Sequence, residues 1–196
     1  MIDKELMAKY TPILLGLLLA ITACERPAPP VSAEAEPPYN LLAYLQHQVE
    51  LLEAKQPMVL KSVTTGEAPT ETIETDEIGW ENELAVFETA DLNRSTLLEN
   101  YAMEEQVLPD GNISIKYVQV EDAEPVVQYL HLVLSPDREF RQLEALLEEQ
   151  NIIFFSRRKL QLSADPATGN ISSYRVEGVQ RLAFSDSLHY KIDANL

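Results

Sequence analysis

The stretch Val126-Val127-Gln128-Tyr129-Leu130-His131-Leu132-Val133-Leu134 is mostly apolar and has the residue types of a β-strand. Side chains along a strand alternate between two faces, so the stretch divides into two rows. One row holds Gln128, Leu130, Leu132 and Leu134, and the other holds Val127, Tyr129, His131 and Val133. Both rows are largely apolar, which predicts a central strand of a sheet that helices cover on one side. His131 is then expected to be a hydrogen-bonded histidine of the core or sheet face, with a catalytic role as the weaker alternative.

Further strands are expected on both sides of this stretch. Pro109-Asp110-Gly111 is a good turn between two of them, because glycine tolerates the positive φ that tight hairpins need. Alternating and β-branched residues predict strands at Met58–Thr65, Thr70–Thr75, Tyr101–Leu108, Asn112–Val120, Arg138–Gln150, Ile152–Ser163, Ile171–Leu182 and Ser187–Ala194. Together with Val126–Leu134 they predict an antiparallel meander of about eight or nine strands.

Helical spacing appears in two places before the meander. Apolar residues recur on one face of the segment Asn40–Lys55, at Leu41, Tyr44, Leu45, Val49 and Leu52. Ile78–Ala90 is the second helix, with Asp76 as its expected N-cap and with Trp80, Leu84 and Phe87 against the sheet. A third, short helix is expected from Ser95 to Asn100, capped by Asn93. The predicted class is α+β, an amphipathic N-terminal helix and one or two short helices packed on a curved antiparallel sheet.

The N-terminal segment indicates where in the cell the protein is located. The apolar run from Pro12 to Ile21 is shorter than the roughly 20 residues of a membrane-spanning helix, and it ends in Thr22-Ala23-Cys24. This pattern resembles the lipobox of a bacterial lipoprotein signal peptide. Cys24 is the only cysteine of the chain, so it has no partner for an internal disulfide. We therefore expect residues 1–23 to be a cleaved signal and Cys24 to be the lipid attachment site, the alternative being an ordinary signal with a chance cysteine.

Residues 24–38 are expected to be a tether. They begin with the lipidated cysteine and continue with five prolines among small and acidic residues, a composition that favours extended chain at roughly 3 Å per residue. Residues 39–196 then form a single α+β domain. Its location is expected to be the cell envelope, lipid-anchored in the outer membrane, on either the periplasmic or the surface side.

Charge limits the partners. The chain has 32 acidic and 15 basic residues, a net charge of −17, which excludes a nucleic-acid partner and argues against membrane contact beyond the lipid anchor.

Arg157-Arg158-Lys159 is its one basic cluster. We expect it to form an exposed ladder with acidic residues of neighbouring strands, with an anion or headgroup site as the alternative. Asp186-Ser187-Leu188 resembles a short O-glycosylation signal of bacterial envelopes.

The middle of the chain carries a resemblance to a family. The residues are Trp80-Glu81-Asn82-Glu83-Leu84-Ala85-Val86-Phe87, then Ala90-Asp91-Leu92-Asn93-Arg94 and Asn100-Tyr101. With the helix before and the strands after, they are similar to a group of uncharacterised lipoproteins of Bacteroidota-type envelopes. The resemblance implies the fold and a location in the cell envelope. The family has no known active site, so the resemblance assigns no catalytic residue to this chain.

Arg138–Gln150 is ambiguous from its own residues. Phe140, Leu143 and Leu147 have helical spacing, whereas Leu143, Ala145 and Leu147 alternate as in a strand. The family resemblance implies a strand, which we adopt, paired with the next strand across Gln150-Asn151.

No catalytic motif is present in the sequence. It lacks a Gly-rich phosphate loop, a His-x-x-x-His pair and a Gly-x-Ser-x-Gly elbow, so no cofactor and no metal ligand is predicted. We expect a non-enzymatic accessory or binding protein that engages another envelope protein. The alternative is a carrier of lipid or another apolar ligand in a half-barrel sheet, and an enzyme is the third possibility.

Overall fold

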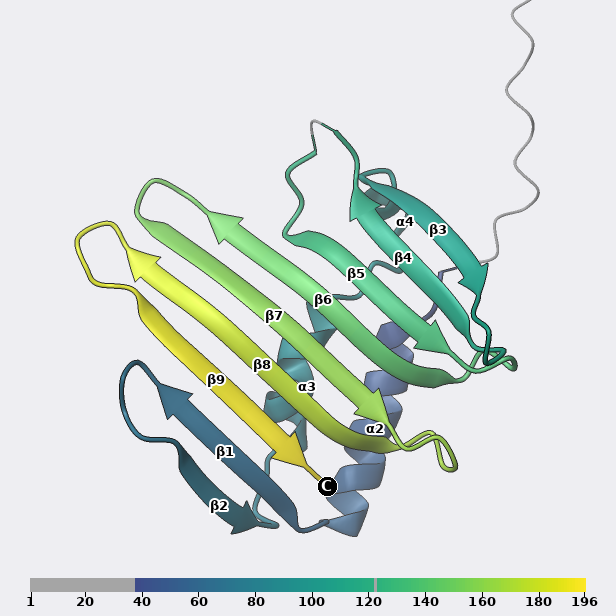
Figure 1. Cartoon of the computed structure of the whole chain (residues 1–196), viewed down its shortest axis with the longest axis horizontal. Coiled ribbons are helices and arrows are strands. Elements are labelled where there is room, and N and C mark those ends of the chain that lie inside the picture. The colour runs from purple at the N-terminus through teal and green to yellow at the C-terminus, as the bar shows by residue number, and fades with distance from the viewer. Residues whose placement is uncertain (1–37, 122) are drawn as a thin grey trace, which may run out of the picture. The chain divides into compact units, whose positions relative to one another are not determined.

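The computed structural model describes residues 38–121 and 123–196. The predicted signal, most of the tether and Cys24 lie outside the described residues. Within them, nine strands form a single antiparallel sheet (Figure 1). The strands are β1 (Val59–Thr65), β2 (Glu71–Thr75), β3 (Tyr101–Val107), β4 (Ile113–Gln119), β5 (Val127–Leu134), β6 (Phe140–Gln150), β7 (Phe154–Ala164), β8 (Ile171–Leu182) and β9 (Leu188–Asn195).

The sheet order is β2-β1-β9-β8-β7-β6-β5-β4-β3. Strands β3 to β9 form a meander in which each strand pairs with the next along the chain. The first hairpin, β1–β2, joins the far side of β9, where Val63 pairs with Ile192 and Thr65 with Tyr190. The antiparallel sheet of nine strands is thus confirmed, but the meander covers only the seven strands β3 to β9, because the early hairpin joins the sheet beyond its last strand.

Three helices lie in the described residues: α2 (Leu41–Lys55), α3 (Trp80–Glu88) and the short α4 (Ser95–Leu98). Helix α2 begins where the Asn40 side chain accepts a hydrogen bond from the Ala43 amide at 3.0 Å. It ends at Gln56, which adopts the left-handed conformation (φ 44°) that closes many helices. The predicted caps of the other two helices are wrong, because α3 starts after Gly79 and α4 after Arg94, neither of which gives a side-chain cap.

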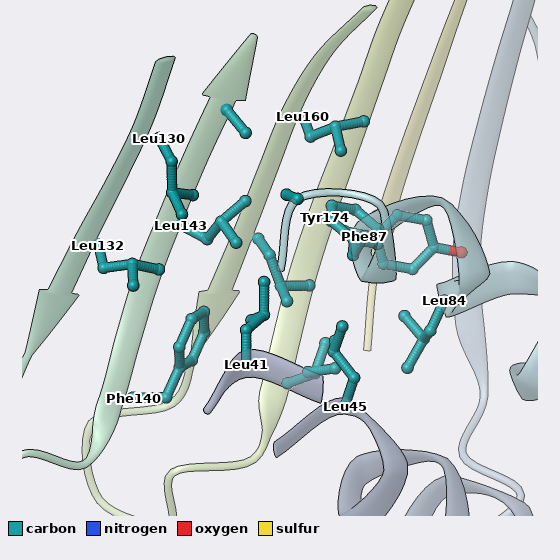
Figure 2. Packing of buried hydrophobic residues seen from close by; sticks show 14 of the residues in the cluster. Leu41, Leu45, Leu84, Phe87, Leu130, Leu132, Phe140, Leu143, Leu160 and Tyr174 are labelled. Atoms are coloured by element: carbon teal, nitrogen blue, oxygen red, sulfur yellow. The ribbon is translucent and has the colours of Figure 1, made fainter. Parts of the chain in front are cut away.

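The core lies between the sheet and the helices α2 and α3, on one face of the sheet (Figure 2). Leu41 and Leu45 of α2 and Leu84 and Phe87 of α3 are fully buried against it. The strands contribute alternate residues, among them Ile115, Tyr117, Leu130, Leu132, Leu134, Phe140, Leu143, Ala145, Leu147, Leu160, Leu162, Tyr174 and Val176. Burying a large aliphatic side chain stabilises the fold by about 1.5–3 kcal/mol, so this one face supplies most of the stability.

β6 resolves the ambiguous segment as a strand. A bulge in its pairing with β5 separates the pair Leu134–Phe140 from the pair Val133–Gln142. The bulge inserts one extra residue, so Phe140 and Leu143 both reach the core although they are three positions apart. That spacing is what gave the segment its helical appearance.

A second bulge corrects the predicted faces of β5. It lies between Val127 and Tyr129, and it puts Val127, instead of Gln128, on the buried face with Leu130, Leu132 and Leu134. At β7 the predicted start is also wrong. Ile152, expected to be the first residue of this strand, lies in the turn before it and is 97% exposed.

Replacement of Leu45 by alanine tests the position of the core. Leu45 has no exposed surface, so Leu45→Ala should lower the free energy of unfolding by about 2–5 kcal/mol. Urea unfolding followed by circular dichroism measures the change. The control is Gln46→Ala on the exposed side of α2, expected to change stability by less than about 0.5 kcal/mol. Equal effects of the two substitutions would contradict the orientation of α2.

Candidate functional site

The sheet has two unlike faces. Helices α2 and α3 lie on the same side of it, which we term the helix face (Figure 1). We term the opposite side the open face. No element of the described residues packs on it, and it carries the other half of the alternating side chains, most of them polar.

A row of polar and charged residues crosses the middle of the open face. Register pairing brings together, in order from β4 to β9, Lys116, His131, Glu144, Gln161, Arg175 and Asp193. We call this set the central row. Within it the Gln161 side chain donates to Glu144 at 3.2 Å, and the Arg175 guanidinium donates to Asp193.

A second row lies beside the central row. Register pairing aligns Leu146, Lys159, Glu177, Lys191 and Thr64 across β6, β7, β8, β9 and β1. Ion pairs link it to the central row: Lys159 Nζ lies 3.4 Å from Glu144 Oε1, and Lys191 Nζ lies 3.1 Å from Asp193 Oδ2. Cations and anions therefore alternate in both directions over this part of the face.

Two hollows lie between these side chains. The larger, about 430 Å³, opens over the second row and is lined by Thr64, Gly66, Leu146, Arg157, Lys159, Glu177, Gly178, Val179, His189, Tyr190 and Lys191. The smaller, about 230 Å³, lies at the central row near Gln161, Arg175 and Asp193. The lining of the larger hollow includes the apolar side chains of Leu146 and Val179, three cations and the carboxylate of Glu177, the cations being Arg157, Lys159 and Lys191. Such a hollow has room for an apolar or acidic side chain.

The basic cluster behaves as its residues predicted. Arg157 and Lys159 share the open face, and each meets a glutamate of β6: Arg157 Nε lies 3.3 Å from Glu148 and Lys159 Nζ 3.4 Å from Glu144. Arg158 points to the helix face, 3.8 Å from Glu149. The ladder interpretation is thus confirmed, although the hollow above Lys159 was not foreseen.

The ion pairs shift the ionisation of the central row. Burial opposes the charge of Asp193, but hydrogen bonds from Arg175 and Lys191 outweigh it and hold the pKa of Asp193 below its ordinary value. The hydrogen bond to Asp193 raises the pKa of Arg175. Both groups therefore stay charged at neutral pH, and the row keeps its alternating pattern.

His131 lies on the open face in β5, two strands from the β3 edge of the sheet. Its Nε2 is 2.9 Å from the buried hydroxyl of Ser114, and burial, with the nearby Lys116, lowers its pKa. The ring is therefore neutral at pH 7. This is the hydrogen-bonded sheet-face histidine that the sequence predicted.

A polar cluster of the helix face joins α3 to the sheet. Glu83 accepts from Lys61 Nζ at 2.6 Å and from the Tyr174 hydroxyl at 2.6 Å. Burial, together with the hydrogen bond to Glu83, raises the pKa of Tyr174, so the phenol stays protonated. Trp80 begins the same helix and is buried in the core, as predicted. These residues hold α3 in place.

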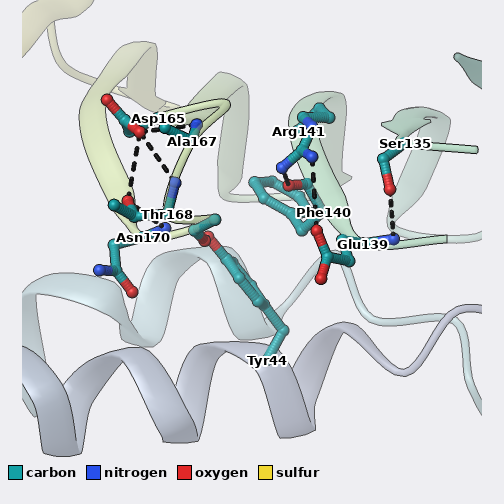
Figure 3. Close-up of polar contacts among 10 residues, drawn as sticks. Tyr44, Ser135, Glu139, Phe140, Arg141, Asp165, Ala167, Thr168 and Asn170 are labelled. Atoms are coloured by element: carbon teal, nitrogen blue, oxygen red, sulfur yellow. Dashed lines mark hydrogen bonds and ion pairs between the residues drawn. The ribbon is translucent and has the colours of Figure 1, made fainter. Parts of the chain in front are cut away.

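Helix α2 is held by the turn between β7 and β8 (Figure 3). Tyr44 donates to the Gly169 carbonyl at 3.0 Å, and its ring stacks on Phe140 with the centroids 4.3 Å apart. The Asp165 carboxylate shapes the turn by accepting from the Ala167 and Thr168 amides at 2.8 and 3.0 Å, and these bonds lower its pKa. The contacts are structural, and they fix α2 against the helix face.

The predicted lipid attachment site, Cys24, is outside the described residues. In residues 38–121 and 123–196, no group of three or more histidine, cysteine or acidic side chains has the arrangement of a metal site. Within the same residues, no helix has the length and apolar character needed to span a membrane.

Comparisons of this chain with family models, with curated proteins and with solved structures found no match. The charged rows and the hollows of the open face make it the candidate site.

Proposed function

We propose that this protein is a non-enzymatic binding protein of the bacterial cell envelope, held in the outer membrane through a lipid on Cys24. Its open face engages another envelope protein. The observation that carries the proposal is the asymmetry of the sheet: α2 and α3 pack on one face, and the charged rows and both hollows lie on the other.

The pattern of charge on the open face supports a protein partner. A single exposed ion pair contributes only about 0–1 kcal/mol to the stability of the fold. Stability alone therefore does not explain why the open face has so many ion pairs. Alternating rows, in contrast, fix the register of a partner and reject partners with like charges in opposition. The larger hollow adds apolar lining at Leu146 and Val179, where a partner side chain gains burial.

Packing of the helix face argues against the alternative, a carrier of lipid or another apolar ligand. In a half-barrel the ligand would lie between the helices and the sheet. Leu41, Leu45, Leu84, Phe87 and Trp80 occupy that space, each with at most 1% of its surface exposed.

The polar groups described above give little support to the third alternative, that this protein is an enzyme. Tyr174, Glu83 and Lys61 are the closest polar cluster on the helix face, and each is engaged in holding α3. His131 is held by Ser114 on an open surface, where water is not excluded.

Lipid attachment is tested in a bacterium that processes lipoproteins. The full chain, grown with an alkyne fatty acid, should incorporate the label and sediment with the membranes. Cys24→Ala should lose both the label and the sedimentation, because no other thiol is present. Ser32→Ala, in the same proline-rich segment, is the matched control and should behave as wild type. An unlabelled wild-type chain, or a labelled Cys24→Ala chain, would refute the anchor.

Binding by the open face is tested with a photoreactive phenylalanine analogue at Leu146, in the cells that make the protein. Ultraviolet light should give one discrete crosslinked species, identified by mass spectrometry. The same analogue at Gln46, exposed on the outer side of α2, should give none. Lys159→Glu places a third carboxylate beside Glu144 and Glu177, and it should reduce the crosslink at least about tenfold by like-charge repulsion. Crosslinks from Gln46 alone would contradict the proposal.

A further inference from the structure

Two hairpin turns at one end of the sheet expose large apolar side chains. Ile152 and Ile153 lie in the β6–β7 turn, while Leu182, Phe184 and Leu188 lie in or beside the β8–β9 turn. We call these five residues the apolar tip. Ile152 is 97% exposed and Phe184 102% exposed, so almost nothing in the described chain covers either side chain.

The two turns form one unit. The Ala183 amide donates to the Ile153 carbonyl at 3.0 Å, which joins the second turn to the first. The Asn151 side chain holds the first turn by accepting from the Ile153 and Phe154 amides at 3.0 and 2.9 Å. Both turns lie side by side at the same end of the strands (Figure 1). The apolar side chains thus stand on a common, hydrogen-bonded base.

Charge is sparse at the tip. Residues 150–156 include no charged side chain, and residues 182–188 include one, Asp186, in a protein whose net charge is −17. Cations follow just behind it: the Arg181 guanidinium carbon lies 5.8 Å from the centre of the Phe155 ring, and Arg157 stands two residues beyond Phe155. An apolar end with a single carboxylate, followed by arginines, has the order of polarity met on passing from the hydrocarbon of a bilayer to its phosphate layer.

We propose that the apolar tip inserts into the surface of a lipid bilayer, as a second membrane contact beside the anchor. A surface that binds a protein partner is usually a groove or a flat patch. These side chains instead protrude from two turns, which suits insertion into a bilayer, because lipid deforms around them. Asp186 and the neighbouring Arg181 offset each other, so the tip has no net charge and can approach lipid despite the acidity of the chain. The inference rests on the proposed anchoring only in the choice of bilayer, which is the one within reach of the tether.

The test uses tryptophan as a depth probe. The full chain carrying Phe184→Trp is coupled through its single cysteine, Cys24, to a maleimide lipid in phosphatidylcholine vesicles. Attachment then does not depend on biological acylation. The native Trp80 is 1% exposed and serves as an internal reference. The matched control is Val107→Trp, a 74% exposed position in β3 near the opposite end of the sheet.

Phe184→Trp should shift its emission to shorter wavelength in vesicles, and brominated phosphatidylcholine should quench the added fluorescence at least about twofold. Val107→Trp should show neither change. Equal quenching of the two variants, or none in either, would overturn the proposal. Shielding of Phe184→Trp from aqueous acrylamide in native envelopes but not in vesicles would also overturn it, in favour of a protein partner. If the apolar tip does not insert into the bilayer, the Cys24 label and the Leu146 crosslink should be unchanged. This result is therefore distinct from failure of the proposed function.

Discussion

Burial of one face of a nine-stranded sheet beneath two helices is the constraint on which the structure depends. The apolar side chains of α2 and α3 reach the sheet from one side only, and alternation along each strand sends the next residue to the other side. Every strand position is thereby committed either to the core or to solvent. The hairpin β1–β2 extends the same arrangement beyond β9, where Val59 and Ala194 join the core. The open face is a consequence of this one-sided packing.

The elements of the fold were predictable because their signals are local. Helical spacing from Leu41 to Leu52 and alternation in most strands predicted the elements to within a few residues, and the structure confirms them. Bulges were not predictable, since an extra residue leaves no mark in composition. The one near Val127 reversed the expected face of Gln128, and the one near Phe140 made a strand look helical. Helix caps were also missed, because backbone geometry at Gly79 and Arg94 begins α3 and α4 without help from a side chain. The nine-strand sheet makes the protein mostly β, so α+β describes it only broadly.

The candidate site was less predictable than the fold. The sequence indicated a ladder at Arg157 and Lys159, but the hollow also needs Lys191, Glu177 and Leu146, which come from three other strands. Their neighbourhood depends on register, which no local pattern gives. Leu146 is instructive, because an apolar residue next to the core residues Ala145 and Leu147 reads as part of an apolar run, and only the strand geometry puts it on the open face. The apolar tip was missed because Ile152 was assigned to the start of a strand instead of to the turn before it.

In the function that we propose, the open face binds a protein, the apolar tip contacts the bilayer and Cys24 carries the anchor, so the three roles fall to separate parts of the chain. Carbene footprinting of the full chain, once purified and once in its native envelope, tests that division most directly. Loss of labelling at Leu146 and Val179 in the envelope, with unchanged labelling of Gln46 and Glu50 on α2, is the expected result. Protection of α2 with the open face still labelled would contradict the assignment of the open face as the binding surface.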